Sequence, residues 1–243
     1  MTDLTRRLLA EFLGTALLVT VVVGSGIAAE QLSPNDTGVQ LLENSTATVL
    51  GLAVLILVFG PISGAHFNPV VSAADWLLGR RHRTGLRGRD LAGYIAAQTA
   101  GGSAGAVLAN VMFDHPAWQI STHHRITSGH LVAEVVATAG LVAVVFALAR
   151  SGRAALSAAA VAAYIGAAYW FTSSTSFANP AVTVGRVFSD TFAGIAPTST
   201  PAYIAAQIVG GLVGLALITV LYPATTAVAA DNAVIPRDSA DTD

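Results

Sequence analysis

Two asparagine-proline pairs are the residues of this chain whose chemistry is easiest to interpret. Asn68-Pro69-Val70 lies in the first half of the chain and Asn179-Pro180-Ala181 in the second, and each introduces a short apolar run. Proline at the first helical position has no N–H to leave unpaired, and an asparagine before it can cap the helix through its side-chain oxygen. The amide NH2 of each asparagine would then be free to donate into a lumen. The pattern predicts two helix N-termini that offer hydrogen bonds to a solute.

The charge of these helix ends determines which solutes they accept. Each N-terminus carries about +0.5 of an elementary charge, so a monovalent cation about 5 Å from both is repelled by roughly 3 kcal/mol at an effective dielectric of about 20. The chain contains no cysteine, and neither a nucleophile with a neighbouring base nor a set of metal ligands accompanies the motifs. We therefore predict a site for neutral solutes that needs no cofactor and no metal ion, and no enzyme activity.

Other residues repeat around the two motifs in the same order. Tyr94-Ile-Ala-Ala-Gln98 recurs as Tyr203-Ile-Ala-Ala-Gln207, and each is followed by a pair of glycines. Glu11 is matched in the same way by Glu134. The members of all three pairs are separated by similar lengths of chain, which indicates a tandem duplication. The function is therefore expected between two related halves.

The composition indicates that these halves lie in a lipid bilayer. Hydrophobic residues make up 53% of the 243 residues, charged residues only 11%, and the mean hydropathy is +0.64. Apolar runs of about 20 residues recur, which is the length that a helix needs to cross a membrane. A net charge of -2 gives no indication of a nucleic-acid partner. We predict an all-α membrane protein with six spans, at roughly 8–29, 43–61, 91–113, 129–149, 154–173 and 202–223.

The arginines orient the predicted spans. All twelve basic residues are arginine, and ten of them precede the first span, lie between spans two and three or four and five, or belong to the tail. By the positive-inside rule these segments and both termini are cytoplasmic, as in a protein of the inner (plasma) membrane. Three spans per repeat invert the second repeat, at approximately 129–223, relative to the first, at 6–113. Together they form one domain over 1–223, followed by a polar tail at 224–243 that is expected to be disordered.

The segments that follow Asn68 and Asn179 are too short to be spans. Each has about ten apolar residues, or roughly 15 Å of helix, which is half of a hydrocarbon core of about 30 Å. Irregular backbone at membrane depth is tolerated only where it is buried in protein or lines a water-filled cavity. We predict two re-entrant half-helices that enter from opposite faces and meet near the midplane.

These features resemble the major intrinsic protein family, the aquaporins and aquaglyceroporins. The resemblance rests on the paired motifs, on Ser63-Gly64-Ala65-His66-Phe67 before the first of them, and on the repeated glutamate and glutamine elements. It extends from Arg6 to Tyr222. It implies six helices and two half-helices around a pore for water and small neutral solutes, in protomers that form a homotetramer. Val70 stands where the family usually has alanine, which we interpret as a conservative change at a packing position.

The resemblance also locates a selectivity filter, and here the chain departs from the family. Val182 replaces the family's arginine, and the other filter positions correspond to Thr48, Ala167 and Ser176. We expect a wide, uncharged and mildly polar filter. Similar filters occur in a bacterial subgroup associated with arsenic resistance, which implies passage of glycerol-like polyols and of metalloid hydroxides such as arsenous acid. Arg186 lies one turn beyond Val182 on the same helical face and could be a displaced filter arginine, but the extra turn favours a side chain that extends to the outer mouth.

The remaining polar residues of the predicted spans are expected to support the pore. A carboxylate inside a membrane can mark a proton path, but the symmetric positions of Glu11 and Glu134 favour a structural role. The resemblance implies that they accept N–H groups of the loop before each half-helix, and that Gln98 and Gln207 belong to the same networks. His66 resembles the family's histidine in the cytoplasmic vestibule.

Two other functions stay open at this stage. One is a water-selective aquaporin. The other is an inverted-repeat secondary transporter, which also places broken helices at the midplane but needs ionisable groups for coupling, where this chain has neutral amides. The polar residues between the third and fourth spans are expected to lie in a solvated outer loop, without a metal site: His115, His123, His124 and Arg125.

Overall fold

Helices form the regular structure of the residues that the structure describes, which are 1–80 and 84–223. The computed structural model has long helices α1 (Asp3–Leu32), α2 (Thr37–Ser63), α4 (Gly88–Met112), α5 (Ser128–Arg150), α6 (Ser157–Phe171) and α8 (Thr200–Leu221). Short helices α3 (Pro69–Gly79) and α7 (Pro180–Gly185) accompany them, with 3-10 turns η1 (Ala154–Leu156) and η2 (Arg186–Phe188). The predicted tail at 224–243, and with it the prediction of disorder, lies outside the described residues.

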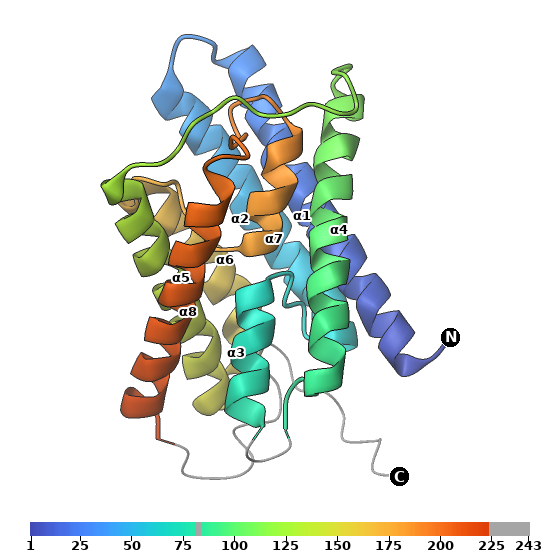
Figure 1. Ribbon diagram of the computed structural model, residues 1–243, viewed down its shortest axis with the longest axis vertical. Helices are drawn as coiled ribbons and strands as arrows, with labels where there is room; N and C mark the ends of the chain where they lie inside the picture. The colour runs from blue at the N-terminus through green and yellow to red at the C-terminus, as the bar shows by residue number, and fades with distance from the viewer. Residues whose placement is uncertain (81–83, 224–243) are drawn as a thin grey trace.

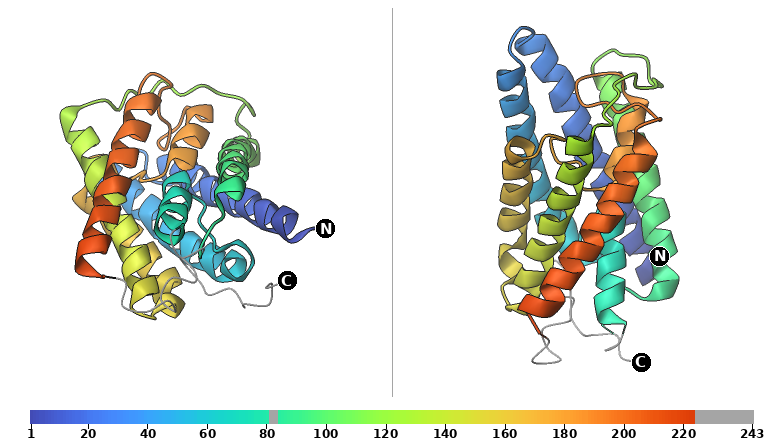
Figure 2. Two further views of the ribbon diagram at one scale, coloured as in Figure 1. Left: turned by 60° about the horizontal axis from the view of Figure 1, so that its bottom comes forward. Right: turned by 60° about the vertical axis from the view of Figure 1, so that its left-hand side comes forward.

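The long helices surround the two short ones (Figure 1). α3 and α7 lie one above the other in the middle of the bundle, and the ends at which they begin face each other. The start of α1 and the end of α8 lie at one end of the bundle, which we call the terminus end. The connection at 113–127 crosses the opposite end, which we call the loop end. From two other sides, α3 and α7 again lie between α4 and α8 (Figure 2).

The packing of the first four α-helices is repeated by the last four. α1 packs against α2 and α4, and α5 packs correspondingly against α6 and α8. Across the halves, α2 packs against α6, while α4 contacts α7 and α8 contacts α3. Each contact therefore has a counterpart in the other half, which is the arrangement expected of a duplicated chain.

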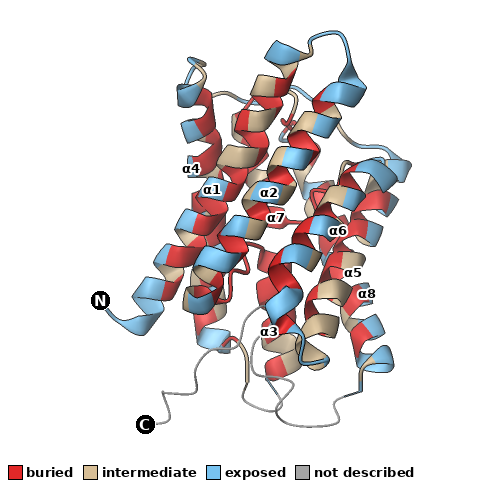
Figure 3. Ribbon diagram, turned by 180° about the vertical axis from the view of Figure 1, so that it is seen from behind, coloured by how far each residue is buried: buried red, intermediate tan, exposed pale blue. Residues whose placement is uncertain are grey.

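The outside of the bundle is apolar. Five of the described helices are long and apolar enough to cross a membrane: α1, α2, α5, α6 together with η1, and α8. α4, which corresponds to the predicted span at 91–113, is 25 residues long but is rich in glycine and polar residues and is not among them. The outer faces of the helices are exposed while their inner faces are buried (Figure 3), and large apolar side chains such as Leu50, Leu57 and Leu212 are exposed. Such a surface suits a lipid environment.

Several helices start before their predicted spans because polar caps lie outside the apolar runs. The Thr2 hydroxyl accepts the N–H of Thr5 at 3.2 Å and starts α1, and the Asp36 carboxylate accepts the N–H of Val39 at 3.0 Å and starts α2. Hydropathy locates the apolar part of a helix, whereas capping determines where the helix begins. α6 is shorter than its predicted span at 154–173, because a 3-10 turn occupies the first residues.

Glycines allow the helix pairs to approach backbone to backbone. A Cβ atom at Gly105 of α4 would lie 2.1 Å from the carbonyl oxygen of Ala16 on α1. A Cβ atom at Gly214 of α8 would lie 2.7 Å from the carbonyl oxygen of Ala139 on α5. Both distances are shorter than van der Waals contact allows. In lipid, where helices gain little from burying apolar surface, close packing of this kind supplies the association energy.

We predict that Gly105→Ala destabilises the protein by about 1–3 kcal/mol, because α1 and α4 must move apart to admit the methyl group. The measurement is the thermal unfolding midpoint of purified protein in detergent. Gly129→Ala is the matched control, because a Cβ atom there would lie 3.7 Å from the Ser173 hydroxyl oxygen, which is an ordinary contact distance. Equal midpoints for the two variants would contradict the proposed role of the α1–α4 contact.

Candidate functional site

Each short helix begins at its asparagine, as predicted. The Oδ1 atoms of Asn68 and Asn179 accept the backbone N–H groups of Val70 and Ala181, at 2.9 Å in both helices. Pro69 and Pro180 occupy the first helical positions. α3 is 11 residues long, whereas α7 is shorter and is continued by η2. A side-chain cap and a proline without an N–H thus begin both helices inside the protein.

The two asparagines also tie the helix starts together. Asn68 Nδ2 donates to the carbonyl oxygen of Ala178 at 2.8 Å, and Asn179 Nδ2 donates to that of Phe67 at 2.7 Å. An amide NH2 has two protons, so one is used within the protein and the second remains for a solute. The expectation was that the amide NH2 groups are free to donate into a lumen, and part of each group is instead bonded within the protein. These two hydrogen bonds also oppose the repulsion between the positive ends of the two helix dipoles.

The loops before the short helices share a rare backbone conformation. Ala65 and Phe67 have φ values of 47° and 48°, and their counterparts in the second half, Ser176 and Ala178, have values of 51° and 48°. Residues other than glycine adopt this left-handed backbone conformation at a cost of about 1–2 kcal/mol each. Such strain persists only where the surroundings determine the conformation. Two buried carboxylates provide these surroundings.

Glu11 holds the first loop. It is fully buried, and its oxygens accept the N–H groups of His66 at 3.0 Å and Phe67 at 2.8 Å. They also accept the Ser63 hydroxyl at 2.6 Å and the Gln98 amide at 2.7 Å. The charge is therefore stabilised by four donors of the same half of the chain.

Glu134 holds the second loop with the corresponding atoms. It is fully buried and accepts the N–H groups of Phe177 and Ala178, both at 2.9 Å. The Ser174 hydroxyl at 2.6 Å and the Gln207 amide at 2.7 Å complete the set. Both carboxylates thus make the loop hydrogen bonds that the resemblance implies for them.

The glutamines link the carboxylates to the short helices. Gln98 donates to the Ser72 hydroxyl of α3 at 2.8 Å, and Gln207 donates to the Thr183 hydroxyl of α7 at 2.8 Å. Both glutamines are fully buried. Carboxylate, loop and short helix therefore form one connected network in each half.

The third residue of each motif packs its short helix against the bundle. A Cβ atom at Gly211 of α8 would lie 2.4 Å from a methyl group of Val70, so valine fills the space that this glycine leaves. In the other half, a Cβ atom at Gly102 of α4 would lie 2.7 Å from the backbone carbonyl oxygen of Ala181, so there the backbone of α7 itself lies close to α4. Neither Val70 nor Ala181 lines the central cavity.

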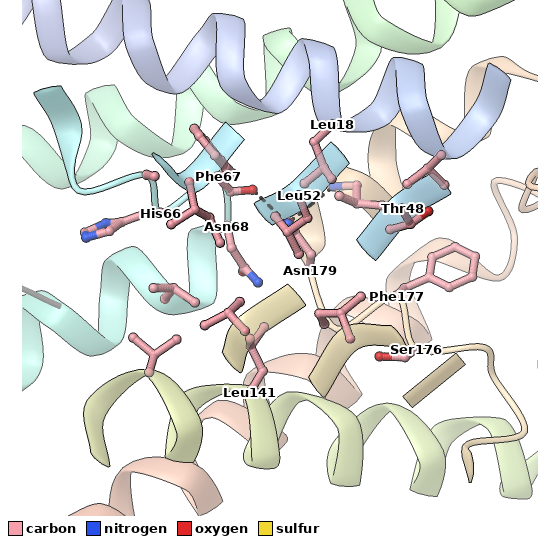
Figure 4. Close-up of a pocket in the computed structure, with 18 of the residues that line it drawn as sticks. Leu18, Thr48, Leu52, His66, Phe67, Asn68, Leu141, Ser176, Phe177 and Asn179 are labelled. Carbon is pink, nitrogen blue, oxygen red and sulfur yellow. Dashed lines mark hydrogen bonds between the residues drawn. The ribbon is translucent and has the colours of Figure 1, made fainter. Parts of the chain in front are cut away.

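A cavity with a volume of about 70 Å³ lies between the starts of the short helices and the walls of α1, α2, α5 and α6. Asn68 and Asn179 lie near its middle, with His66 on one side and Thr48, Ser176 and Phe177 on the other (Figure 4). Residues at four-residue spacing supply one face of each wall helix, and most are aliphatic: Leu18, Val22, Leu52, Ile56, Leu141, Val145, Val161 and Ile165. These walls offer no hydrogen bond to a solute, so polar contacts concentrate at the asparagines and at the two ends.

Three of the four predicted filter residues line the loop end of this cavity. Thr48, Ser176 and Val182 are all buried in its wall. The Thr48 hydroxyl lies 3.2 Å from the Tyr169 hydroxyl. The Ser176 hydroxyl is buried without a hydrogen-bond partner among the described residues. A buried hydroxyl without a partner has lost its hydrogen bonds to water, which costs about 1–3 kcal/mol.

Ala167 is not part of the cavity wall, which corrects the fourth filter assignment. It is exposed on α6, and the cavity face of that helix consists of Val161, Ile165 and Tyr169. A residue two positions beyond Ile165 points about 200° around the helix. The filter position on α6 was assigned by its spacing from the second motif, which gave Ala167 and not Tyr169. Such an assignment assumes a conformation for the loop that joins α6 to α7.

Arg186 lies in the cavity wall, and the expectation that it extends to the outer mouth is wrong. It is 3% exposed, and its guanidinium carbon lies 3.4 Å from the centre of the Phe177 ring. Its Nε donates to the carbonyl oxygen of Ala193. The expectation of an uncharged filter is therefore also wrong at the loop end. Apart from its position one turn after Val182, no sequence signal identifies this residue.

His66 lines the other side of the cavity, toward the terminus end. Its Nδ1 lies 3.1 Å from the Ser72 hydroxyl, and its Nε2 lies 3.8 Å from a carboxylate oxygen of Asp75. That carboxylate oxygen accepts the N–H of Leu86 at 2.7 Å. Asp75 is 4% exposed, and it connects the histidine to the segment after α3.

The connection between α4 and α5 is only partly solvated. His123 and His124 are exposed, as expected of an outer loop. Arg125, in contrast, donates to the carbonyl oxygen of Gly194 at 2.7 Å, and its guanidinium lies 5.5 Å from the centre of the Phe177 ring. The loop is therefore attached to the wall of the cavity.

A second contact holds this loop. The N–H of Thr122 donates to the carboxylate of Asp190 at 2.7 Å, and this hydrogen bond lowers the pKa of Asp190. The N–H of Ser121 donates to the carbonyl oxygen of Val187 at 2.9 Å. The segment after α7 is thus paired with the loop that crosses above it.

We predict that Glu134→Gln destabilises the protein by about 1–3 kcal/mol for each buried donor that it leaves unpaired. The substituted amide has a single acceptor oxygen, and its NH2 group faces the N–H groups that the carboxylate accepted. Thermal unfolding in detergent measures the effect. Glu43→Gln is the control, because Glu43 accepts one hydrogen bond, from Ser33 at 3.1 Å. A similar loss in both variants would show that the loop does not depend on the carboxylate.

Known proteins share this sequence and arrangement. A family model described as major intrinsic protein matches residues 1–175. "Aquaglyceroporin AqpS" of Rhizobium meliloti (strain 1021) is 48% identical over 215 residues, which cover 88% of this chain and 89% of that protein. The "Glycerol uptake facilitator protein" of Pseudomonas aeruginosa is 40% identical over 105 residues, which cover 43% of this chain and 35% of that protein.

A solved structure shows that the fold is shared as well. The X-ray structure of the aquaglyceroporin from Plasmodium falciparum aligns with a TM-score of 0.64 at 19% identity, over 88% of this chain and 95% of that one. Family model, sequence relative and fold agree with each other. The chain therefore belongs to the major intrinsic protein family, whose members are integral membrane channels and not enzymes.

Proposed function

We propose that the protein is a passive channel for water and small uncharged solutes, namely glycerol-like polyols and metalloid hydroxides such as arsenous acid. One observation carries this proposal: a largely apolar cavity is lined at its middle by two facing helix N-termini, whose asparagine amides offer hydrogen bonds. The similarity to a protein named aquaglyceroporin supports glycerol as one of the solutes.

The geometry favours neutral solutes for two reasons. The aliphatic walls do not replace the hydration of an ion, and removing a charge from water without such compensation is strongly unfavourable. At the middle, Asn68 and Asn179 each have one N–H left for an acceptor oxygen. The helix dipoles behind them add a repulsion for cations of roughly 3 kcal/mol. A hydroxyl-bearing solute meets neither obstacle.

We further infer a placement in the inner membrane with both termini in the cytoplasm. In this placement α4 is the sixth crossing, and α3 and α7 are re-entrant half-helices of inverted repeats at approximately 6–113 and 129–223. The helix ends at the terminus end carry arginines, consistent with the positive-inside rule: Arg6, Arg7, Arg87, Arg89, Arg150 and Arg153. The apolar outer faces suit lipid and the other protomers of a homotetramer.

The proposed filter lies at the loop end and the vestibule at the terminus end. The filter consists of Thr48, Ser176 and Val182, with Tyr169 in the place that the sequence assigned to Ala167 and with Arg186 in addition. The vestibule contains His66. Whether polyols pass this filter distinguishes the proposal from a water-selective aquaporin.

We expect proteoliposomes to shrink rapidly in an impermeant osmolyte and to re-swell in glycerol and in arsenous acid, followed by stopped-flow light scattering. Val182→Arg should reduce re-swelling in glycerol by about tenfold or more while the protein still inserts, because a long charged side chain would occupy the cavity wall. Val182→Leu, which adds volume without charge, should have a smaller effect. Water flux with no glycerol or arsenous acid flux would refute the broad solute range.

A second prediction separates the channel from a secondary transporter. Glycerol flux should run in both directions down its gradient and should not respond to an imposed proton or sodium gradient, because neutral amides form the middle of the cavity. The measurement is radiolabelled glycerol uptake with and without each ion gradient. Uptake against the glycerol gradient would exclude a channel.

A further inference from the structure

We propose that Arg186 is the specificity-determining residue at the loop end of the pore. It lies one turn after Val182, the residue that replaces the family's arginine. The inference rests on the proposed function, since it names the residue that limits which neutral solutes pass the same channel. The observations that support it are the position of the guanidinium, its free donors and the loop that holds it.

The guanidinium is fixed in the wall by two contacts. It lies 3.4 Å from the centre of the Phe177 ring, a distance at which a flat cation and an aromatic face attract each other. Nε donates to the carbonyl oxygen of Ala193, which orients the group. Phe177 itself packs edge-on against Tyr203, with ring centres 5.2 Å apart. The guanidinium of Arg186 therefore has a defined position in the cavity wall.

The two remaining nitrogens of the guanidinium are available to a solute. Nε is the nitrogen of Arg186 that donates to protein within the described ranges, and Nη1 and Nη2 carry four further N–H donors. Neither of those two nitrogens is sealed inside the protein without a partner, so they reach open space. The hydroxyl of Ser176, in the same wall, is buried and lacks a partner in the described part of the chain. The guanidinium thus presents unused hydrogen-bonding capacity to the cavity, whereas the Ser176 hydroxyl beside it is closed off from it.

Other residues at this end of the cavity add hydroxyl groups and apolar surface. Thr48 and Tyr169, from α2 and α6, bring their hydroxyl groups to 3.2 Å across the cavity wall. Phe177 and Val182 contribute apolar surface. A solute at this end of the cavity therefore meets hydroxyl groups and a fixed cation. This arrangement accepts a small neutral molecule with several acceptor oxygens and opposes a larger or positively charged one.

The connection between α4 and α5 keeps Arg186 in place from outside the cavity. Arg125 bonds the carbonyl oxygen of Gly194, next to the residue that accepts from Arg186, and its guanidinium lies 5.5 Å from the centre of the Phe177 ring. The hydrogen bond from Thr122 to Asp190 fastens the same segment. The cation is therefore supported by a second part of the chain, as a residue that controls selectivity requires.

The test compares polyol and water permeability in proteoliposomes of the full chain. Arg186→Met removes the charge and the donors, and Phe177→Leu keeps the arginine but removes the ring that orients it. We expect both variants to raise the permeability to a five-carbon polyol, relative to water, by about tenfold. Arg153→Met is the matched control, since it removes an exposed cation at the terminus end and should leave this ratio unchanged.

The outcomes separate this inference from the proposed function. If the wild type passes no glycerol, the proposed solute range fails, but polyol passage that appears in Arg186→Met would still support the role of Arg186. A polyol-to-water ratio in both Arg186→Met and Phe177→Leu that matches the wild type would overturn the inference. If Arg186→Met does not insert into membranes, the result for Phe177→Leu decides.

Discussion

The structure depends on two helices that begin inside the protein, where no bulk water can satisfy their backbone. The loops that lead to α3 and α7 carry N–H groups that have no partner within a helix. They also include residues with positive φ. An unpaired backbone group at this depth would cost several kcal/mol. Glu11 and Glu134 meet this requirement, because one carboxylate accepts two consecutive N–H groups and two side-chain donors. The carboxylates are therefore part of the scaffold that holds the asparagines in the cavity.

Duplication explains why this solution occurs twice. The hydrogen bonds of the two halves correspond atom by atom, and the distances agree within about 0.1 Å for the hydroxyl, glutamine and loop donors. Equivalent helices face opposite ends of the bundle, so the two helix N-termini meet in the middle with the same sign of charge. A single half would leave its short helix without the opposing loop carbonyl that its asparagine bonds. The site therefore exists only between the halves.

The two ends of the cavity differ where the halves have diverged. His66 and Phe177 hold equivalent places before the two motif asparagines, and Asp75 and Arg186 hold equivalent places after them. At the terminus end, histidine and carboxylate lie 3.8 Å apart. At the loop end, the equivalent positions hold an aromatic ring and a guanidinium in contact. The same backbone thus supports a histidine beside a carboxylate at one end and an aromatic ring beside a guanidinium at the other, and the asymmetry resides in side chains.

Local chemistry and repetition could be recognised in the sequence by itself. Asparagine-proline caps, apolar runs and duplicated signals specify helix starts, a membrane environment and related halves, because each acts over a few residues or through simple periodicity. Only the tertiary structure decided which side chains line the loop end. The rotation of α6 in the bundle determines whether Ala167 or Tyr169 faces the cavity. Whether Arg186 extends outward or folds back depends on Phe177, Ala193 and a loop much earlier in the chain. The rotation of α6 and the contact with the distant loop carry no local signal, so spacing from a motif could not locate these residues.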